Sequence, residues 1–258
     1  MMNFLFFFEN ISRKSIIAYL ILRYLFIKLF RGILFEKEAN GFKKIKIKKN
    51  LNIVDIGVND GLSTSFFLKI FKDSKFYIFE PLRFNKSYLK NNRNNSVKYF
   101  NFALGEKNYS QYINIPYLVF FSYLKFYLSA YSTISNSKNH IYEINKSLKT
   151  FLNYKKLKNH KLKIKIKKLD NLNIKADIIK LDVEGHEDQV INGAKNTIKT
   201  YKPLLYIERP SKNIVKILKK VEYEIYVFDI QKNLFIKVTK ISKKFRNYYF
   251  FNKKRKLF

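Results

Sequence analysis

Apolar runs and helical spacing alternate along most of the chain from residue 41 onward. Near-continuous apolar runs predict strands that are buried on both faces. The segment Lys161–Asp170 instead alternates lysine with leucine or isoleucine, which predicts a strand with one face in water. The predicted buried strands are Leu51–Gly57, Lys75–Pro81, Val97–Gly105, Asp177–Gly185 and Pro203–Pro210.

Helical spacing is clearest over Glu187–Tyr201, where apolar residues recur on one face. Another helix is expected to begin near Leu62. The repetition of strand, helix and strand predicts a parallel sheet with right-handed crossovers and helices on both faces. The chain therefore has the pattern of an α/β fold. Its last three predicted strands are closely spaced and indicate an antiparallel hairpin finish: Glu224–Ile230, Asn233–Val238 and Asn247–Lys253.

The N-terminal segment has a different character. Residues 4–35 are apolar, aromatic and basic, with uncharged stretches too short to span a bilayer and no small-residue cleavage site of a signal peptide. We expect residues 1–40 to form a basic amphipathic helical segment and residues 41–258 to form the main domain. The helix either packs on its own domain or contacts an anionic membrane surface. Its basic residues share one half of the helix: Arg13, Lys14, Arg23, Lys28 and Arg31.

The composition is strongly basic, with 52 lysine and arginine residues against 19 acidic residues and a formal net charge of +33. This charge indicates either attraction to a polyanion or compositional drift, because the lysines are spread along the whole chain. Cysteine is absent, which excludes disulfides and cysteine metal sites and fits a reducing compartment. We expect a cytoplasmic protein, with peripheral contact at the inner face of a membrane as the alternative.

The segment Tyr117–His160 is the least regular part of the chain and is rich in aromatic residues, serine, asparagine and lysine. An insertion before a later strand often forms a substrate-facing loop. A structural connector is the alternative interpretation.

The first chemical motif is VDIGVNDG at Val54–Gly61. A predicted strand ends at Asp55, and Gly57 permits a tight turn and the close approach of a ligand. The helix that follows offers unpaired N–H groups at its start. The next strand ends in Glu80, 19 residues after Gly61, where a carboxylate can accept both hydroxyls of a ribose. A solvated strand-end carboxylate is the structural alternative.

The second motif is KLDVEGHE at Lys180–Glu187, where scarce acidic residues gather at the end of a strand. If this strand neighbours the first one, Asp182 stands beside the Gly57 turn, and Glu208 ends the following strand at the same edge. Helix capping is the alternative role for Glu184 and Glu187. His186 is able to titrate near neutrality, although a lone histidine is often structural.

These motifs resemble those of the FkbM family of methyltransferases. The resemblance covers residues 50–253 and departs from the family at Val58, where alanine is usual. It implies a Rossmann-like class I methyltransferase fold with a mostly parallel seven-stranded sheet, and S-adenosylmethionine as methyl donor. The matching segments, in order, are VDIGVNDG, FEP, FALGE, YSTIS, KKLDNL, KLDVEGHE, Gly193–Ala194, PLLYIE and NYYFFN.

The resemblance also implies O-methylation, often of sugars or secondary metabolites, and so a small-molecule or glycan acceptor. The acceptor side would lie near Asp182, Glu184 and the YSTIS loop. The residues that the resemblance assigns to the cofactor are Asp55, Gly57, Asn59 and Glu80, and we assign Gly61 and Ala103 to the same site.

A sugar hydroxyl is a poor nucleophile, so a base or a metal ion is expected to assist. The candidates for the base are Asp182, Glu184 and Glu208, with His186 as a further catalytic candidate. Alternatively, Asp182 and Glu184 bind Mg²⁺ through their oxygen atoms. The sequence does not decide between these two, and it does not indicate an oligomeric state.

Two other functions compete with this one. The charge is compatible with an RNA-directed methyltransferase, but the tetrapeptides NPPY and DPPY and a cysteine nucleophile are absent. A non-catalytic basic protein that binds membrane or RNA is the other. An acidic cluster at the crevice edge would repel a polyanion, so a nucleic-acid partner is not expected.

Overall fold

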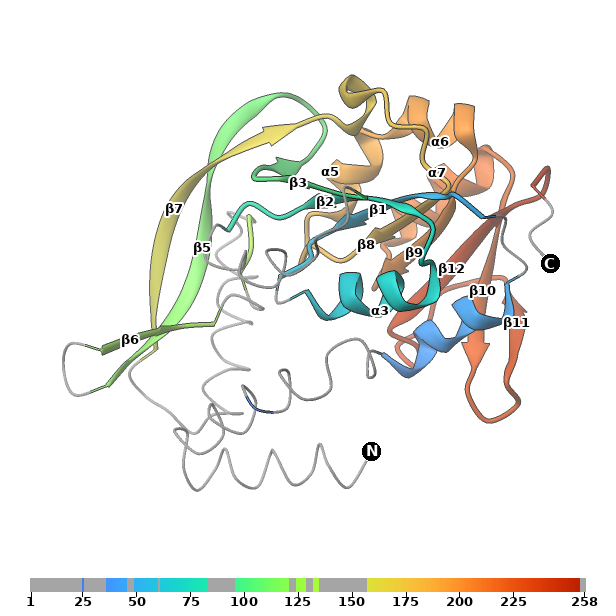
Figure 1. Ribbon diagram of the computed structural model, residues 1–258, viewed down its shortest axis with the longest axis horizontal. Coiled ribbons are helices and arrows are strands. Elements are labelled where there is room, and N and C mark those ends of the chain that lie inside the picture. Colours follow the sequence, from blue (N-terminus) through green and yellow to red (C-terminus); the bar gives the residue numbers. More distant parts are fainter. Residues whose placement is uncertain are drawn as a thin grey trace. The chain divides into compact units, whose positions relative to one another are not determined.

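The computed structural model describes residues 36–45, 49–59, 61–82, 96–120, 124–128, 132–134 and 157–255, together with Leu25. Among these residues an eight-stranded sheet has the order β11-β10-β12-β9-β8-β1-β2-β3 (Figure 1). The five strands β9, β8, β1, β2 and β3 pair in parallel. The strand β12 pairs antiparallel with β9 and with β10, and β10 pairs antiparallel with β11. The strands are β1 (Asn52–Ile56), β2 (Lys75–Phe79), β3 (Val97–Phe100), β8 (Ile178–Leu181), β9 (Leu204–Glu208), β10 (Tyr223–Asp229), β11 (Leu234–Val238) and β12 (Asn247–Asn252).

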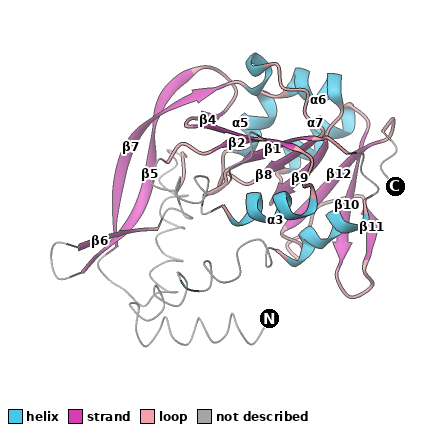
Figure 2. Cartoon of the chain, in the orientation of Figure 1, coloured by secondary structure: helices cyan, strands magenta, loops and turns pink. Residues whose placement is uncertain are grey.

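Helices cover both faces of this sheet, as the apolar pattern predicts (Figure 2). One face packs against α3 (Leu62–Ile70) and the 3₁₀ helix η1 (Lys37–Lys44), and the other against α5 (Glu187–Asn192), α6 (Lys195–Tyr201) and α7 (Lys212–Lys220). The α/β fold class with a mostly parallel sheet is therefore confirmed. The sheet has eight strands instead of seven, because β10 pairs with β12 on one side and β11 on the other.

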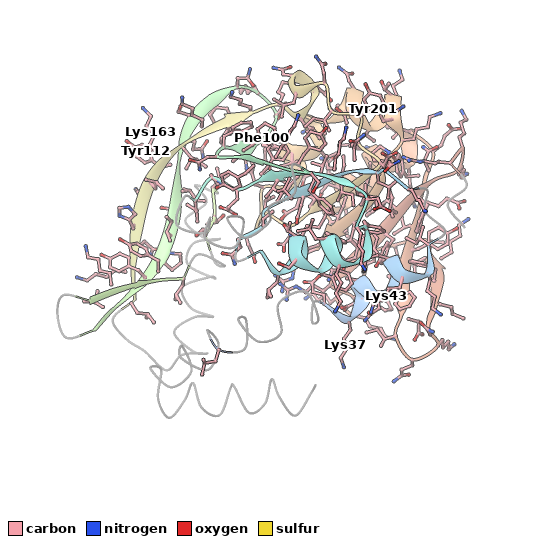
Figure 3. All side chains as sticks on the ribbon, in the orientation of Figure 1. Lys37, Lys43, Phe100, Tyr112, Lys163 and Tyr201 are labelled. Atoms are coloured by element: carbon pink, nitrogen blue, oxygen red, sulfur yellow. The ribbon has the colours of Figure 1, made fainter. Side chains whose placement is uncertain are left out.

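The 3₁₀ helix η1 crosses the domain boundary that we predicted after residue 40. It turns Ala39 and Phe42 into the core and leaves Lys37 and Lys43 exposed (Figure 3). The ring of Phe42 packs at 4.9 Å from that of Phe67 on α3, measured between centroids. The 3₁₀ helix η1 therefore shares a core with α3, and the domain boundary after residue 40 stays a prediction.

Other predicted elements differ in detail. The helix over 187–201 is two helices, α5 and α6, because the chain bends at Gly193, where a Cβ atom would lie 1.9 Å from the carbonyl oxygen of Gly105. The strand predicted over 97–105 is divided into β3 and β4 (Ala103–Leu104), which belong to different sheets. The long strand β5 (Tyr109–Phe120) and the short η4 (Leu169–Leu172) had not been predicted.

A second sheet has the order β4-β7-β5-β6, with β6 at Leu124–Tyr127 and β7 at Leu157–Lys167. The chain divides into two compact units: residues 1–31 with 112–163, and residues 32–111 with 164–258. In the first unit β5 pairs antiparallel with β6, and Thr133 of the YSTIS loop bridges Asn114. Apart from Leu25, the part of the predicted N-terminal helical segment 1–40 that precedes residue 36 lies outside the described residues, as does most of the segment 117–160. Among the described helices, none has the length and apolar character needed to cross a membrane.

Candidate active site

The candidate site lies within the second unit, at the edge of the sheet where β1, β2, β8 and β9 end. These four strands are mutually parallel, so their carboxyl ends meet at one edge. The chain leaves β1 toward β2 on one side, and β8 pairs with β1 on the other side. This reversal is the position at which open α/β sheets bind ligands. The sequence prediction that Gly57, Glu80, Asp182 and Glu208 share this edge matches their positions in the structure.

Gly57 is required here by a crossing of two backbones. Its φ is +78°, and a Cβ atom at this position would lie 1.7 Å from the carbonyl oxygen of Asp182. Gly57 was expected to permit a tight turn and the approach of a ligand; its positive φ fits the turn, and its close neighbour is the chain that leaves β8. Gly57 therefore brings the two motifs together, since no larger residue permits this contact.

Glu80 follows β2 and is almost fully buried, with 5% of its surface exposed. One carboxylate oxygen accepts a hydrogen bond from the backbone N–H of Asn59 at 2.8 Å, and the other accepts one from that of Leu82 at 2.9 Å. Burial raises the pKa of Glu80 to about 7, although these two hydrogen bonds act to lower it. Asn59 has a positive φ of 48°, so its turn directs the backbone N–H toward Glu80.

Asp55 has a different environment from the one expected of a ligand-binding residue. It is fully buried, and its Oδ2 accepts hydrogen bonds from the hydroxyls of Ser63 and Thr64 at 2.9 and 2.7 Å. Its Oδ1 lies 3.6 Å from the Nζ of Lys180. Asp55 thus joins β1, the start of α3 and β8, and Gly61 lies at the N-cap of the same helix.

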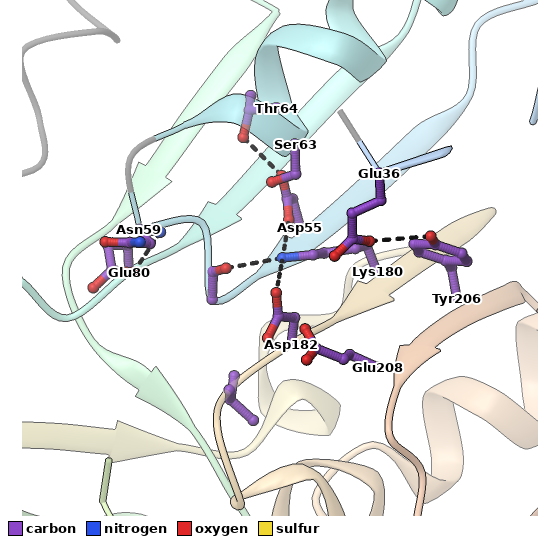
Figure 4. Close-up of polar contacts among 12 residues, drawn as sticks. Glu36, Asp55, Asn59, Ser63, Thr64, Glu80, Lys180, Asp182, Tyr206 and Glu208 are labelled. Atoms are coloured by element: carbon purple, nitrogen blue, oxygen red, sulfur yellow. Dashed lines mark hydrogen bonds and ion pairs between the residues drawn. The ribbon is translucent and has the colours of Figure 1, made fainter. Parts of the chain in front are cut away.

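Lys180 is the centre of the buried charge network (Figure 4). Its ammonium group donates a hydrogen bond to the carbonyl oxygen of Gly57 at 2.9 Å and lies 3.4 Å from Oδ2 of Asp182. Burial acts to lower the pKa of Lys180, but Asp182 and Asp55 raise it above its ordinary value, so the side chain is a cation. Through Lys180, the glycine turn and the acidic strand end form one structure.

Three carboxylates gather after β8 and at the end of β9: Asp182, Glu184 and Glu208. One oxygen from each lies within 4.8 Å of the others. Burial and the neighbouring Asp182 together raise the pKa of Glu208 to about 8, and burial raises that of Glu184 to about 7. Burial would raise the pKa of Asp182 too, but Lys180 holds it below its usual range. A carboxyl group with a lowered pKa, that of Asp182, therefore neighbours two whose pKa is raised, those of Glu184 and Glu208.

The loop after β8 is shaped to present Glu184. Glu184 has a positive φ of 50°, a conformation that is uncommon in residues other than glycine and asparagine, and Gly185 follows with a φ of 91°. The carboxylate of Glu187 accepts hydrogen bonds from the N–H groups of Val183 and Gly185, at 3.1–3.2 Å. Glu187 therefore organises the backbone of this loop, which agrees with the capping alternative for that residue.

Two other predicted site residues are buried on β4 or beside the chain that leaves it. His186 is 5% exposed, and a Cβ atom at Gly105 would lie 3.1 Å from its Nε2. Burial lowers the pKa of His186 to about 4, so the imidazole is neutral. Ala103 is buried on β4, where it pairs with Ile166 of β7. The catalytic role of His186 and the cofactor role of Ala103 stay predictions.

Sequence reasoning missed several charged members of the site. Lys180 interrupts the apolar run of β8. A lysine inside a strand that is buried on both faces is rare, and this signal could have identified it. Arg246 precedes β12 and donates a hydrogen bond through Nε to Oε1 of Glu208 at 2.6 Å. Glu36, at the start of η1, accepts a hydrogen bond from the hydroxyl of Tyr206. No local pattern marks Arg246 or Glu36.

A model of the methyltransferase FkbM domain matches residues 55–229, which include Glu80, the second motif and all of the first motif except Val54. This chain belongs to the FkbM methyltransferase family. No curated protein sequence matches it.

Two solved structures are similar to this FkbM-family chain. The methyltransferase FkbM from Methylobacillus flagellatus KT is 16% identical, with a TM-score of 0.46; the match covers 78% of this chain and 43% of that one. The precorrin-6y C5,15-methyltransferase from Geobacter metallireducens GS-15 is 10% identical, with a TM-score of 0.39 and coverage of 83% and 84%. Neither TM-score is high enough to bear on function. This chain spans less than half the length of the first structure.

Proposed function

We propose that this FkbM-family chain transfers a methyl group from S-adenosylmethionine to a hydroxyl oxygen of a sugar, glycan or other small molecule. The observation that carries the proposal is the pairing of two strand ends. Glu80 stands after β2, and Asp182 crosses the Gly57 turn after β1. A donor and an acceptor bound at these ends would meet at the switch point of the sheet.

The residues on the β1 and β2 side fit the donor. Glu80 is held by the N–H groups of Asn59 and Leu82, so its position is set before a ligand arrives. Each carboxylate oxygen has a further lone pair for a ribose hydroxyl. S-adenosylmethionine supplies a methyl group on a positively charged sulfur, and its transfer leaves a neutral thioether. The excess of carboxylates at the site favours such a cationic donor.

The chain's own contribution is alignment and proton removal. Holding the two reactants in line supplies about 7–11 kcal/mol of the barrier reduction. As the acceptor oxygen gains the methyl group, its proton has to leave. Asp182 is assigned as the base, because Lys180 keeps its pKa low and its side chain is 28% exposed, whereas that of Glu208 is 5% exposed. Glu184 and Glu208 are the alternative bases.

The acceptor is proposed to be neutral or weakly charged. The carboxylates after β8 and β9 would repel a phosphate backbone, so a nucleic-acid acceptor fits this edge poorly in spite of the high net charge. The acidic edge therefore favours a glycan or small-molecule acceptor over the RNA-directed alternative. A Mg²⁺ ion on Asp182 and Glu184 also stays a proposal.

The donor half of the proposal is tested by calorimetry with S-adenosylmethionine. Glu80→Ala should weaken binding by about 1–3 kcal/mol, because it removes the buried acceptor of the ribose hydroxyls. Asp73→Asn is the matched control, since Asp73 is exposed on the turn after α3. Equal affinity of wild type and Glu80→Ala would refute the role of Glu80.

The catalytic half is tested by Asp182→Asn, which keeps the shape and removes the charge. The variant should bind the donor within a few-fold of wild type and lose about 10²–10⁴ in turnover. The assay is a screen of glycan and nucleotide-sugar acceptors with a labelled methyl donor. Full activity of Asp182→Asn on the acceptor that wild type methylates would show that Asp182 is not the base.

A further inference from the structure

The carboxylates at the ends of β8 and β9 outnumber the cations that face them in the part of the chain that the structure describes. Those cations are Lys180, Arg209 and Arg246. Of these, Arg209 is 65% exposed and therefore compensates little. The carboxyl groups that share the network are Glu36, Asp55, Asp182, Glu184, Glu187 and Glu208.

The contacts of two carboxylates show where the uncompensated charge lies. Oδ2 of Asp182 faces Nζ of Lys180 at 3.4 Å, and Oε1 of Glu208 faces Nε of Arg246 at 2.6 Å. Oε2 of Glu208 accepts no hydrogen bond from a donor in the part of the chain that the structure describes, although Glu208 is only 4% exposed. The neighbouring group is the carboxyl of Asp182, and two buried carboxylates in contact need a proton or a cation between them.

The geometry of the group fits a cation. The carboxyl groups of Asp182 and Glu208 face each other (Figure 4), and one oxygen from each of Asp182, Glu184 and Glu208 lies within 4.8 Å of the other two. Three ligands from two strand ends and one loop can surround an ion. The backbone of that loop is held by Glu187, and Glu184 keeps a positive φ of 50° in it.

We propose that Asp182, Glu184 and Glu208 bind one divalent cation, with Glu208 as a ligand that the sequence alone does not suggest. The ligand set consists only of oxygen atoms, which suits Mg²⁺, Mn²⁺ or Ca²⁺ and not the nitrogen- and sulfur-seeking metals. The remaining positions of an octahedral ion are open to water or to an acceptor hydroxyl. This deepens the proposed function and rests on it, because an ion on Asp182 would take over from that carboxylate the activation of the acceptor hydroxyl, yet the site is defined without the donor.

The test is calorimetry of the full chain with Mn²⁺ and, separately, Mg²⁺, in the absence of S-adenosylmethionine. Wild type should bind one ion per chain and melt at a higher temperature with Mn²⁺. Glu208→Gln and Glu184→Gln should each weaken binding at least tenfold, and Asp73→Asn should bind as wild type does. Circular dichroism of each variant checks its fold, and Glu184→Gln on the loop keeps the test valid if Glu208→Gln fails to fold.

Two results would overturn the cation site. One is no binding of either ion at millimolar concentration, in which case protons or the charge of the donor neutralise the cluster. The other is binding that both variants leave unchanged. S-adenosylmethionine titrated into the same samples keeps the two proposals separate, because failure of donor binding contradicts the proposed function and failure of Mn²⁺ binding contradicts only the ion.

Discussion

Two carboxylates at the same edge of the large sheet differ in their hydrogen bonds. Glu80, after β2, has both oxygens in hydrogen bonds with backbone N–H groups. Glu208, at the end of β9, has one oxygen on Arg246 and one buried oxygen without a hydrogen-bond partner among the described residues. Both are buried, and burial raises the pKa of both.

The difference separates two kinds of binding. A carboxylate whose position is set by backbone donors is ready to accept neutral hydroxyls, and it needs no cation to be stable in place. A carboxylate beside other carboxylates is stable only with a proton or a cation. Under the proposed function, the end of β2 therefore suits a ribose, and the ends of β8 and β9 suit an ion or a proton in transfer. Lys180 lies between the two sides and connects them.

The largest effect is expected from removing that connection. Lys180→Met leaves Asp55 and Asp182 buried without their shared cation, which should cost about 3–5 kcal/mol in the free energy of unfolding. Urea unfolding measures this cost. The double variant Lys180→Met/Asp55→Asn should recover part of it, since one of the two unpaired charges is gone. A loss below about 1 kcal/mol in the single variant would show that Lys180 is not the central cation.

A smaller but still large effect is expected from separating the two backbones. In Gly57→Ala the positive φ costs about 1–2 kcal/mol, and the new Cβ atom has to displace the carbonyl of Asp182 as well. We expect reduced stability together with weaker binding of S-adenosylmethionine. Unfolding and calorimetry on the same sample decide the matter, and wild-type values in both would contradict the crossing.

The third prediction concerns the pH dependence of donor binding. Only the ionised form of Glu80 accepts hydrogen bonds through both oxygens, and its pKa is about 7. The affinity for S-adenosylmethionine should therefore fall roughly tenfold between about pH 7.5 and pH 6. Glu80→Gln should bind more weakly and lose this dependence. A pH profile that is the same in both proteins would remove Glu80 from the donor site.

The same group affects stability with the opposite sign. Its pKa is raised on folding, from 4.5 to about 7, so the unfolded chain binds fewer protons in this range. Its contribution to stability is fully present below pH 4.5 and is lost as the pH rises through 7. Comparing the unfolding of wild type and Glu80→Gln across this window isolates the effect from that of the other carboxyl groups.

The smallest effect is expected at Glu187, which holds the backbone of the loop after β8. Glu187→Gln retains one acceptor for the N–H groups of Val183 and Gly185 and should cost only about 0.5–1.5 kcal/mol. Urea unfolding measures this cost. A cost as large as that of Lys180→Met would mean that Glu187 belongs to the charge network instead of the loop backbone.

The sequence predicted the central strands of the fold better than the boundaries of its elements. Long apolar runs identified β1, β2, β8 and β9, because a strand buried on both faces has no polar positions to confuse with a helix. The division of 97–105 into two strands and the bend at Gly193 were not visible, since both depend on contacts with distant segments. No local pattern in the sequence indicates that β12 lies between β9 and β10 in the sheet.

By itself, the sequence determined which residues end the strands: Gly57, Glu80, Asp182 and Glu208. A parallel sheet then requires that they share one edge. Only the tertiary structure decided how their charges are arranged. Lys180 reaches the Gly57 carbonyl across 123 positions, and Arg246 reaches Glu208 across 38. Burial and distance set the pKa of a carboxyl group, and neither is encoded locally, because both depend on which distant segments pack around it.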